Sequence, residues 1–211
     1  LIMLEPDFGS GMIMVCALIM LIFVTGTDLS IFVKLGILGI FGIIFLVVVA
    51  PYRLKRIVSF INPWSDPLGS GFQIIQSLYA IGPGGLLGQG FLNSRQKHFY
   101  LPEPQTDFIF SVVGEELGFV GSTLIIVILG LIVVQCIKTA RKASDNNGMF
   151  IATGVATLIG IQTFLNIGVA TSLLPNTGIP LPFISYGLSS LVSSCAGMGL
   201  VMNVSLQRRK Y

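Results

Sequence analysis

Five ionisable side chains lie in one short stretch, N-S-R-Q-K-H-F-Y-L-P-E-P-Q-T-D, which runs from Asn93 to Asp107. A long apolar run begins directly after it, at Phe108. Charged groups at the end of a hydrophobic helix carry a free-energy cost in a membrane protein, so they mark a candidate site. Asp107 is the leading candidate, because a carboxylate partly shielded from water can act as a general base toward a hydroxyl group. The simpler interpretation is that Asp107 caps the following helix, and the two roles are compatible.

The neighbours of Asp107 leave more than one interpretation open. Glu103 lies between two prolines, and its carboxylate is either solvated or paired with Arg95 or Lys97. The glycine-rich segment 82–90 predicts either a nest of backbone amides that holds an anion or a flexible turn. No Gly-Lys-Ser/Thr signature follows it, so a nucleotide-binding loop is not indicated.

The composition places these groups in a membrane protein, because 53% of the residues are hydrophobic and only 10% are charged. Several apolar runs reach the ~20 residues that a helix needs to cross a bilayer. We predict an all-α, polytopic transmembrane helical bundle that forms a single membrane domain over residues 1–211. About five spans are expected, at residues 8–24, 31–50, 108–137, 149–174 and 186–206. The chain begins with Leu1 and shows no signal-peptide pattern, which indicates a piece of a longer protein.

Residues 51–107 differ in kind from the rest of the chain, because they hold six of the ten prolines and no run long enough to cross a membrane. Open backbone cannot face lipid, so this segment must lie outside the bilayer or be shielded by protein. Between Phe72 and Gly82 the apolar residues recur at helical spacing, with Gln73, Gln76 and Ser77 on the other side. This pattern predicts an amphipathic helix that lies at the membrane interface.

The basic residues of two short loops, 138–142 and 208–210, predict that both loops are cytoplasmic. The loop 51–107, the turn 175–185 and Asp7 are then extracytoplasmic. Basic residues on this outer side oppose the general rule and indicate either an anionic partner or attraction to lipid headgroups. They are Arg53, Lys55, Arg56, Arg95 and Lys97.

Several long motifs occur in order along the chain. They are E-P-D-F-G-S at residues 5–10, N-P-W-S-D-P-L-G-S-G-F-Q-I-I-Q-S at 62–77, S-R-Q-K-H-F-Y-L-P-E-P-Q-T-D-F-I-F at 94–110, G-E-E-L-G at 114–118 and N-T-G-I-P-L-P-F-I-S-Y-G at 176–187. The series resembles the SEDS family (shape, elongation, division and sporulation), which includes FtsW, RodA and SpoVE. The likeness is to the C-terminal half of the family and favours the FtsW/SpoVE branch.

The resemblance implies a peptidoglycan glycosyltransferase that acts during cell division or sporulation. Such an enzyme polymerises lipid II, an undecaprenyl-pyrophosphate-linked disaccharide pentapeptide, on the outer face of the cell membrane, and it works with a class B penicillin-binding protein. No nucleic acid is expected as a partner. Asp107 matches the residue regarded as catalytic in the family, and Asp7 matches another position important for activity.

Transfer of the sugar would build negative charge on the pyrophosphate leaving group, which basic side chains could stabilise alone or with a divalent cation, Mg²⁺ or Mn²⁺. The candidate substrate-binding residues are Asp7, Arg53, Arg56, Arg95, Lys97 and Glu103. One alternative function is a lipid II flippase, which would depend on polar groups deep in the bilayer such as Gln162 and Asn166. Another is a non-catalytic membrane scaffold for a penicillin-binding protein.

Overall fold

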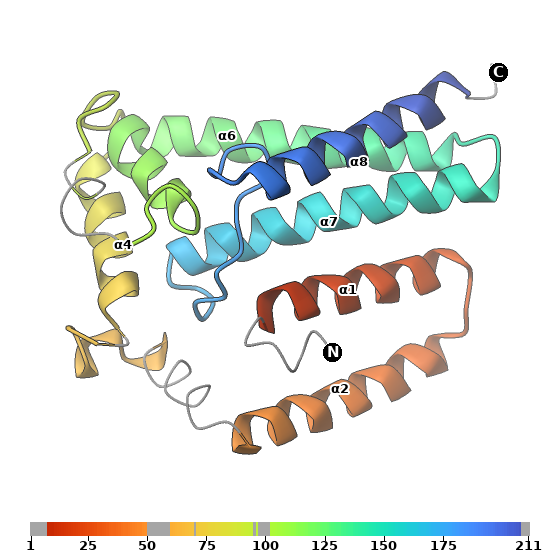
Figure 1. Cartoon of the computed structure of the whole chain (residues 1–211), viewed down its shortest axis with the longest axis horizontal. Helices are drawn as coiled ribbons and strands as arrows, with labels where there is room; N and C mark the ends of the chain where they lie inside the picture. Colours follow the sequence, from red (N-terminus) through yellow and green to blue (C-terminus); the bar gives the residue numbers. More distant parts are fainter. Residues whose placement is uncertain (1–7, 50–59, 70, 95, 97–101, 208–211) are drawn as a thin grey trace.

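The computed structural model describes residues 8–49, 60–69, 71–94, 96 and 102–207 of the chain. All regular elements in these ranges are helices, which confirms the predicted all-α class (Figure 1). They are α1 (Phe8–Val24), α2 (Leu29–Val49), the 3₁₀ helix η1 (Pro63–Ser65), α4 (Phe72–Gly84), α6 (Ile109–Arg141), α7 (Asn146–Ala170) and α8 (Leu188–Leu206).

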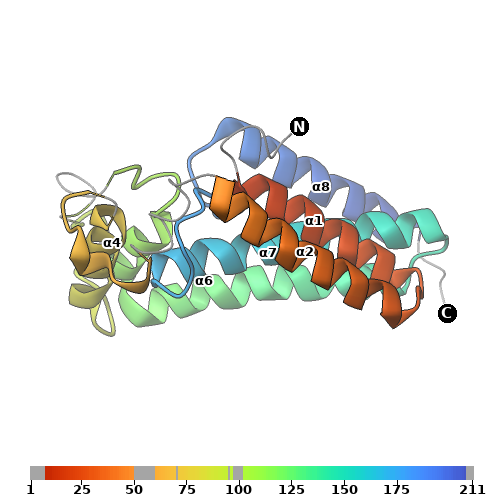
Figure 2. The ribbon, with the colours of Figure 1, turned by 90° about the horizontal axis from the view of Figure 1, so that it is seen from below.

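Helix α7 is central to the bundle, because it packs against α1, α6 and α8. Both views show these helices running alongside one another, with α2 on the far side of α1 (Figures 1 and 2). Helix α4 lies across the end of the bundle at which α6 begins and α7 ends (Figure 1). The connection between α6 and α7 lies at the opposite end, together with the C-terminal end of α8.

Three of the described helices, α6, α7 and α8, are long and apolar enough to cross a membrane. Helix α1 and the part of α2 from Leu29 to Gly42 are shorter apolar helices. The assignment of five spans therefore stays a prediction. Large apolar side chains on α6, such as Leu124 and Leu131, are more than half exposed and are suited to face lipid.

The core between α6, α7 and α8 is built largely from small side chains. Its buried members are Cys136, Ala140, Ala152, Ala156 and Val201. Small residues let neighbouring helices approach closely, which is the usual basis of helix packing in membranes.

Helix α6 is broken at Gly118, whose φ of 65° and ψ of −162° are not helical. In an unbroken helix the amides of Phe119 and Val120 would donate to the carbonyls of Glu115 and Glu116, four residues earlier. They donate instead to the carbonyls of residues 85 and 86, at 2.9 and 3.1 Å, in the loop after α4. The carbonyls of Glu115 and Glu116 accept from residues 89 and 90 of the same loop, at 2.9 and 3.1 Å.

This exchange of hydrogen bonds favours the turn over the anion-holding nest for segment 82–90. The amides of Gly88, Gln89 and Gly90 donate to backbone carbonyls of Gly84, Glu115 and Glu116. Amides that are already bonded in this way do not form an anion-holding nest. The segment is a turn that docks α4 onto the kink of α6.

The predicted polar face of the helix at 72–82 is wrong for one residue. Ser77 was assigned to the polar face, but it is fully buried together with Ile74 and Ala80. The reason is that α4 packs on α6, where the Ser77 hydroxyl finds polar partners and needs no water.

Candidate active site

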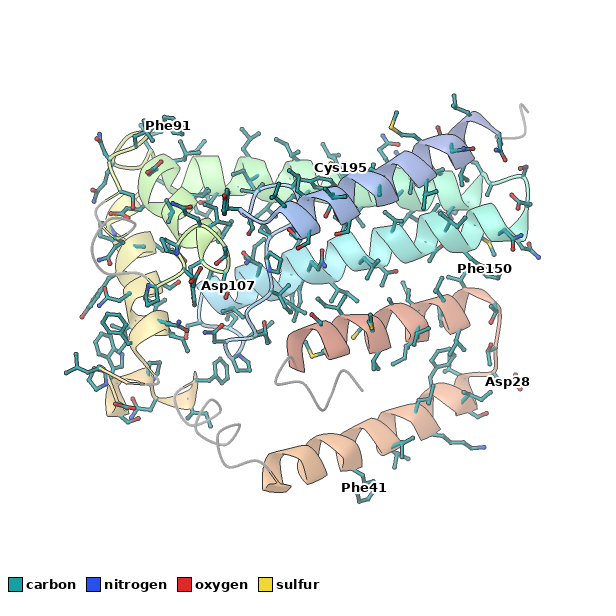
Figure 3. The ribbon with its side chains drawn as sticks, in the orientation of Figure 1. Asp28, Phe41, Phe91, Asp107, Phe150 and Cys195 are labelled. Atoms are coloured by element: carbon teal, nitrogen blue, oxygen red, sulfur yellow. The ribbon has the colours of Figure 1, made fainter. Side chains whose placement is uncertain are left out.

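Asp107 lies immediately before α6, at the end of the bundle that α4 covers (Figure 3). The N-cap position of α6 is occupied by Phe108, and no side chain caps this helix. The N-cap interpretation of Asp107 is therefore wrong. Phe108 is completely buried and packs with Val112 and Val169, which anchors the backbone on one side of Asp107.

The backbone before Asp107 is tied to the loop that joins α7 to α8. The hydroxyl of Ser185 donates to the carbonyl of Thr106 at 2.6 Å and accepts from the amide of Leu181 at 2.7 Å. The amide of Tyr186 donates to the carbonyl of Gln105 at 2.7 Å. The bonds to the carbonyls of Thr106 and Gln105 join segments about 80 residues apart in the chain, so the position of Asp107 depends on a distant loop.

A third tie comes from α7. Asn166, which is 1% exposed, donates from its side-chain amide to the carbonyl of Asp107 and to the carbonyl of Ile179, at 2.8 Å each. One side chain thus connects the start of α6 to the α7–α8 loop.

The turn at residues 176–178 forms the surface that faces the Asp107 carboxylate. Gly178 has a φ of 66°, and a methyl group added there would lie 3.4 Å from Asp107 Oδ2. The Asn176 side chain accepts from the Gly178 amide at 3.2 Å and donates to Gln73 of α4. Gly9, near the start of α1, lies so close to this turn that a methyl group there would be 2.7 Å from the carbonyl oxygen of Thr177.

The electrostatic surroundings raise the pKa of the Asp107 carboxyl, first because burial disfavours its charged form and second because the Glu103 carboxylate repels it. Glu103 itself is exposed, with a φ of 49°. The Thr106 hydroxyl donates to this residue, lying 3.2 Å from its carbonyl oxygen and 3.1 Å from Oε2. A carboxylate with a raised pKa is a stronger base, which suits it to take a proton from a sugar hydroxyl.

Of the seven predicted site residues, the structure brings together Asp107 and Glu103. The other five lie outside the described residues and stay predictions. They are Asp7, Arg53, Arg56, Arg95 and Lys97. The described ranges contain no group of three or more His, Cys, Asp or Glu side chains that could hold a metal ion. The divalent cation also stays a prediction, because Mg²⁺ often binds through one or two carboxylates and substrate phosphates.

Sequence reasoning missed three residues that build the site: Asn166, Gly178 and Ser185. The sequence indicates Asn166 only as a polar group within a predicted span. Its position along the span does not predict that its side chain reaches Asp107. The proline-rich turn signalled a loop, and the glycine at residue 178 was consistent with a positive φ. Neither signal predicts which distant segment the loop contacts.

Glu115 and Glu116 also gain a place that the sequence did not predict. They are 2% and 6% exposed, so they lie inside the protein near the α6 kink. Ser94 donates to both, from its hydroxyl to Glu115 at 2.6 Å and from its amide to Glu116 at 3.4 Å. The pair therefore holds the chain directly before the basic part of the 93–107 stretch.

The comparison with known families settles the membership of the chain. The family model FTSW_RODA_SPOVE, described as "Cell cycle protein", matches residues 1–210. The chain belongs to this family. FtsW/RodA/SpoVE proteins of two bacteria illustrate the likeness. Stage V sporulation protein E of Bacillus subtilis (strain 168) is 54% identical over 209 residues, which cover 99% of this chain and 57% of that protein. The probable peptidoglycan glycosyltransferase FtsW of Geobacter sp. (strain M18) is 45% identical over 97% of this chain and 56% of its own length.

Two solved structures share the fold of this chain, which again matches only part of their length. A chain from a peptidoglycan synthase complex, studied for the coordination of polymerization and crosslinking, matches with a TM-score of 0.73 at 32% identity, over 99% of this chain and 58% of that one. The rod shape determining protein RodA of Thermus thermophilus matches with a TM-score of 0.61 at 27% identity, over 99% of this chain and 52% of RodA. The chain thus spans a little more than half the length of the relatives it matches. Its apolar helices and its family identify it as a multi-pass membrane protein.

Proposed function

We propose that the protein is a peptidoglycan glycosyltransferase that polymerises lipid II, with Asp107 as its general base. The observation that carries the proposal is the Asp107 carboxylate, which is partly shielded from water, has a raised pKa and faces a fixed loop. The names of the similar FtsW proteins support the same reaction.

In the proposed step, Asp107 accepts the proton of the acceptor sugar's 4-hydroxyl group as its oxygen attacks the anomeric carbon of the donor. The new carbon–oxygen bond forms while the bond to the pyrophosphate breaks, and undecaprenyl pyrophosphate leaves with the bonding electrons. Direct displacement converts an α-linked donor into a β-linked product. The position of Asp107 beside a buried hydrophobic core gives the limited water access that such a base requires.

The negative charge of the leaving group needs a counter-charge. We assign this role to the basic residues Arg53, Arg56, Arg95 and Lys97, with a divalent cation where one is bound, and we place Asp7 and Glu103 among the substrate-binding groups. Support for the last assignment is that Glu103 lies close enough to raise the pKa of Asp107. Support for Arg95 and Lys97 is that Ser94, the residue before them, is buried and held by two glutamates.

The proposed setting is the extracytoplasmic face of the cell membrane during division or sporulation, with a class B penicillin-binding protein as partner. The structure supports a common face, because Asp107, α4 and the α7–α8 loop lie at one end of the bundle and the α6–α7 turn with its basic residues lies at the other (Figure 1). The likeness to a chain from a synthase complex supports a partner that crosslinks.

The test is a glycan-chain gel from full-length protein, purified with its partner and supplied with lipid II. Wild-type protein should give polymer, and Asp107→Ala should abolish it while lipid II still binds. Asp28→Ala is the matched control, because Asp28 is an exposed carboxylate in the turn between α1 and α2, at the opposite end of the bundle (Figure 3). Polymer from Asp107→Ala at the normal rate would remove the mechanism.

The two alternatives predict other results. A flippase would move lipid II across vesicles without joining it, and a scaffold would support the partner equally well with Asp107→Asn. The structure supports the flippase alternative less than the sequence does, because the side-chain amide of Asn166 already donates to two backbone carbonyls.

A further inference from the structure

Asn166 connects the two segments that face each other across the site. Its amide donates to the carbonyl of Asp107, just before α6, and to the carbonyl of Ile179, just after the turn that contains Gly178. We propose that Asn166 is a positioning residue that fixes the Asp107 carboxylate against this turn. The inference rests on the proposed glycosyltransferase function and adds a residue that works only through Asp107.

The geometry explains why this link matters for the carboxylate. Gly178 is adjacent to Ile179, and its α-carbon lies where an added methyl group would be 3.4 Å from Asp107 Oδ2. Since one amide group holds the carbonyls on both sides, neither segment can move away without breaking a hydrogen bond. Such bonds are the kind of support that keeps a reacting group in a productive position.

The chemistry of the side chain fits this role closely. A primary amide has two N–H groups and can donate to two carbonyl oxygens at once. Serine offers one donor, and leucine offers none. Of the described residues bonded to the backbone on both sides of the site, Asn166 is the only one that reaches Asp107 itself.

The Asn166 side chain also lowers the stability of the fold in a way that a residue needed only for packing would not. Its Oδ1 atom is buried and accepts no hydrogen bond. An unsatisfied buried acceptor destabilises the folded protein. At a position needed only for packing, an apolar side chain of similar size would be more stable. The cost is consistent with a residue kept for its two donors.

The experiment compares Asn166→Leu and Asn166→Ser with wild type in the full-length protein, using lipid II polymerisation under single-turnover and steady-state conditions. Leucine keeps the number and branching of the side-chain heavy atoms and removes both donors, so kcat should fall about tenfold to a hundredfold, the range expected for a misplaced catalytic group. Serine has one donor, but its hydroxyl ends one bond short of the amide nitrogen, so kcat should fall in this variant as well. KM and the binding of lipid II should stay near the wild-type values, because the Asn166 side chain is only 1% exposed and its amide is bonded to backbone carbonyls.

Thr163→Val is the matched control. Thr163 lies one turn earlier on α7, and its hydroxyl is also buried without a hydrogen-bond partner. The variant changes polarity in the same helix but removes no link to Asp107, so kcat should stay unchanged. Thermal unfolding in detergent verifies that each variant is folded.

Unchanged kcat in folded Asn166→Leu would overturn the inference, and so would a loss confined to KM or an equal loss in Thr163→Val. If Asn166→Leu does not fold, Asn166→Ser decides, because its single hydroxyl still fills part of the site. Wild-type protein and Asp107→Ala run in parallel. Polymer from wild type, none from Asp107→Ala and full activity from the Asn166 variants would reject the positioning role and leave the proposed function standing.

Discussion

The Asp107 carboxylate lies close to Gly178, a residue 71 positions later in the chain, so a side chain at that position would be in van der Waals contact with it. A methyl group at Gly178 would lie 3.4 Å from Asp107 Oδ2. The carboxylate therefore faces a backbone surface on one side, and its remaining open side is where an acceptor hydroxyl would approach.

Gly178→Ala should lower polymerisation. The φ of 66° at Gly178 is a conformation that costs an alanine about 1–2 kcal/mol, and relief of this strain would shift the turn that contacts the Asp107 carboxylate. Gly26→Ala is the control, because Gly26 has a φ of 77° and nothing within 4 Å of the added methyl group. Both variants should lose similar thermal stability, but only Gly178→Ala should lose activity. Equal activity in the two variants would show that the contact with Asp107 has no catalytic consequence.

The pH dependence of polymerisation should report the raised pKa of Asp107. The base acts in its deprotonated form, so activity should fall as the pH drops through a value above the ordinary 3.8. The folded protein binds this proton more tightly than the unfolded chain, so ionisation of Asp107 lowers stability as the pH rises through the raised pKa.

Glu103→Gln removes the like charge that contributes to this shift, so the acidic limb of the pH–rate profile should move to lower pH. Glu103 is exposed and is the smaller of the two causes, so the movement should be modest and should shrink at high salt. A limb that moves to higher pH would contradict the assignment.

The sequence could predict the helices and the place of Asp107, because both depend on local patterns. Apolar runs of about 20 residues indicate membrane helices directly, and the change from polar to apolar residues at Phe108 marked the start of α6. The links to Asn166 and Ser185 were not predictable in this way. They join positions that no spacing rule relates, and each polar side chain had an equally good interpretation as a helix-packing group.

Two local features were also missed, for different physical reasons. Gly118 lies in an apolar run where a single glycine is usually tolerated, so nothing in the local sequence pattern indicates that the helix breaks there. Ser77 looked like part of a solvent-facing side, because a serine at helical spacing does not reveal a buried partner. In both cases the partner lies on another element, and only the tertiary structure shows it.

The buried serine pair between α4 and α6 should behave asymmetrically. Ser77 donates its single proton to the carbonyl of Ala170 at 2.6 Å, so the Ser111 hydroxyl, 2.6 Å away, must donate to Ser77. Ser111→Ala removes one bond and should cost about 1 kcal/mol, whereas Ser77→Ala also strands a buried donor and an acceptor and should cost more, up to about 3 kcal/mol. Thermal unfolding of both variants shows which one loses more stability, and Ser189→Ala, at an exposed position, is the control. The reverse order would refute this proton arrangement.

The break in α6 should depend on glycine. At Gly118, where φ is 65°, an added methyl group would lie 2.3 Å from the amide nitrogen of Gly88. Gly118→Ala should therefore detach the loop after α4 and lower the unfolding temperature clearly. Gly130 lies in the same helix, and a methyl group added there would meet nothing within 4 Å. Gly130→Ala should therefore be neutral or stabilising by up to about 1 kcal/mol. Comparable unfolding temperatures for the two variants would show that the kink does not need its glycine.

The contact between α1 and the loop at Thr177 should matter for activity as well as for stability. A methyl group at Gly9 would lie 2.7 Å from the carbonyl oxygen of Thr177 and 2.9 Å from Cγ1 of Ile179. Because Ile179 shares the Asn166 amide with Asp107, pushing this loop away should disturb the carboxylate. Gly9→Ala should therefore reduce polymerisation while Gly36→Ala on α2, with nothing within 4 Å, should not. If Gly9→Ala unfolds at a lower temperature but keeps full kcat, α1 supports the fold without helping to position Asp107.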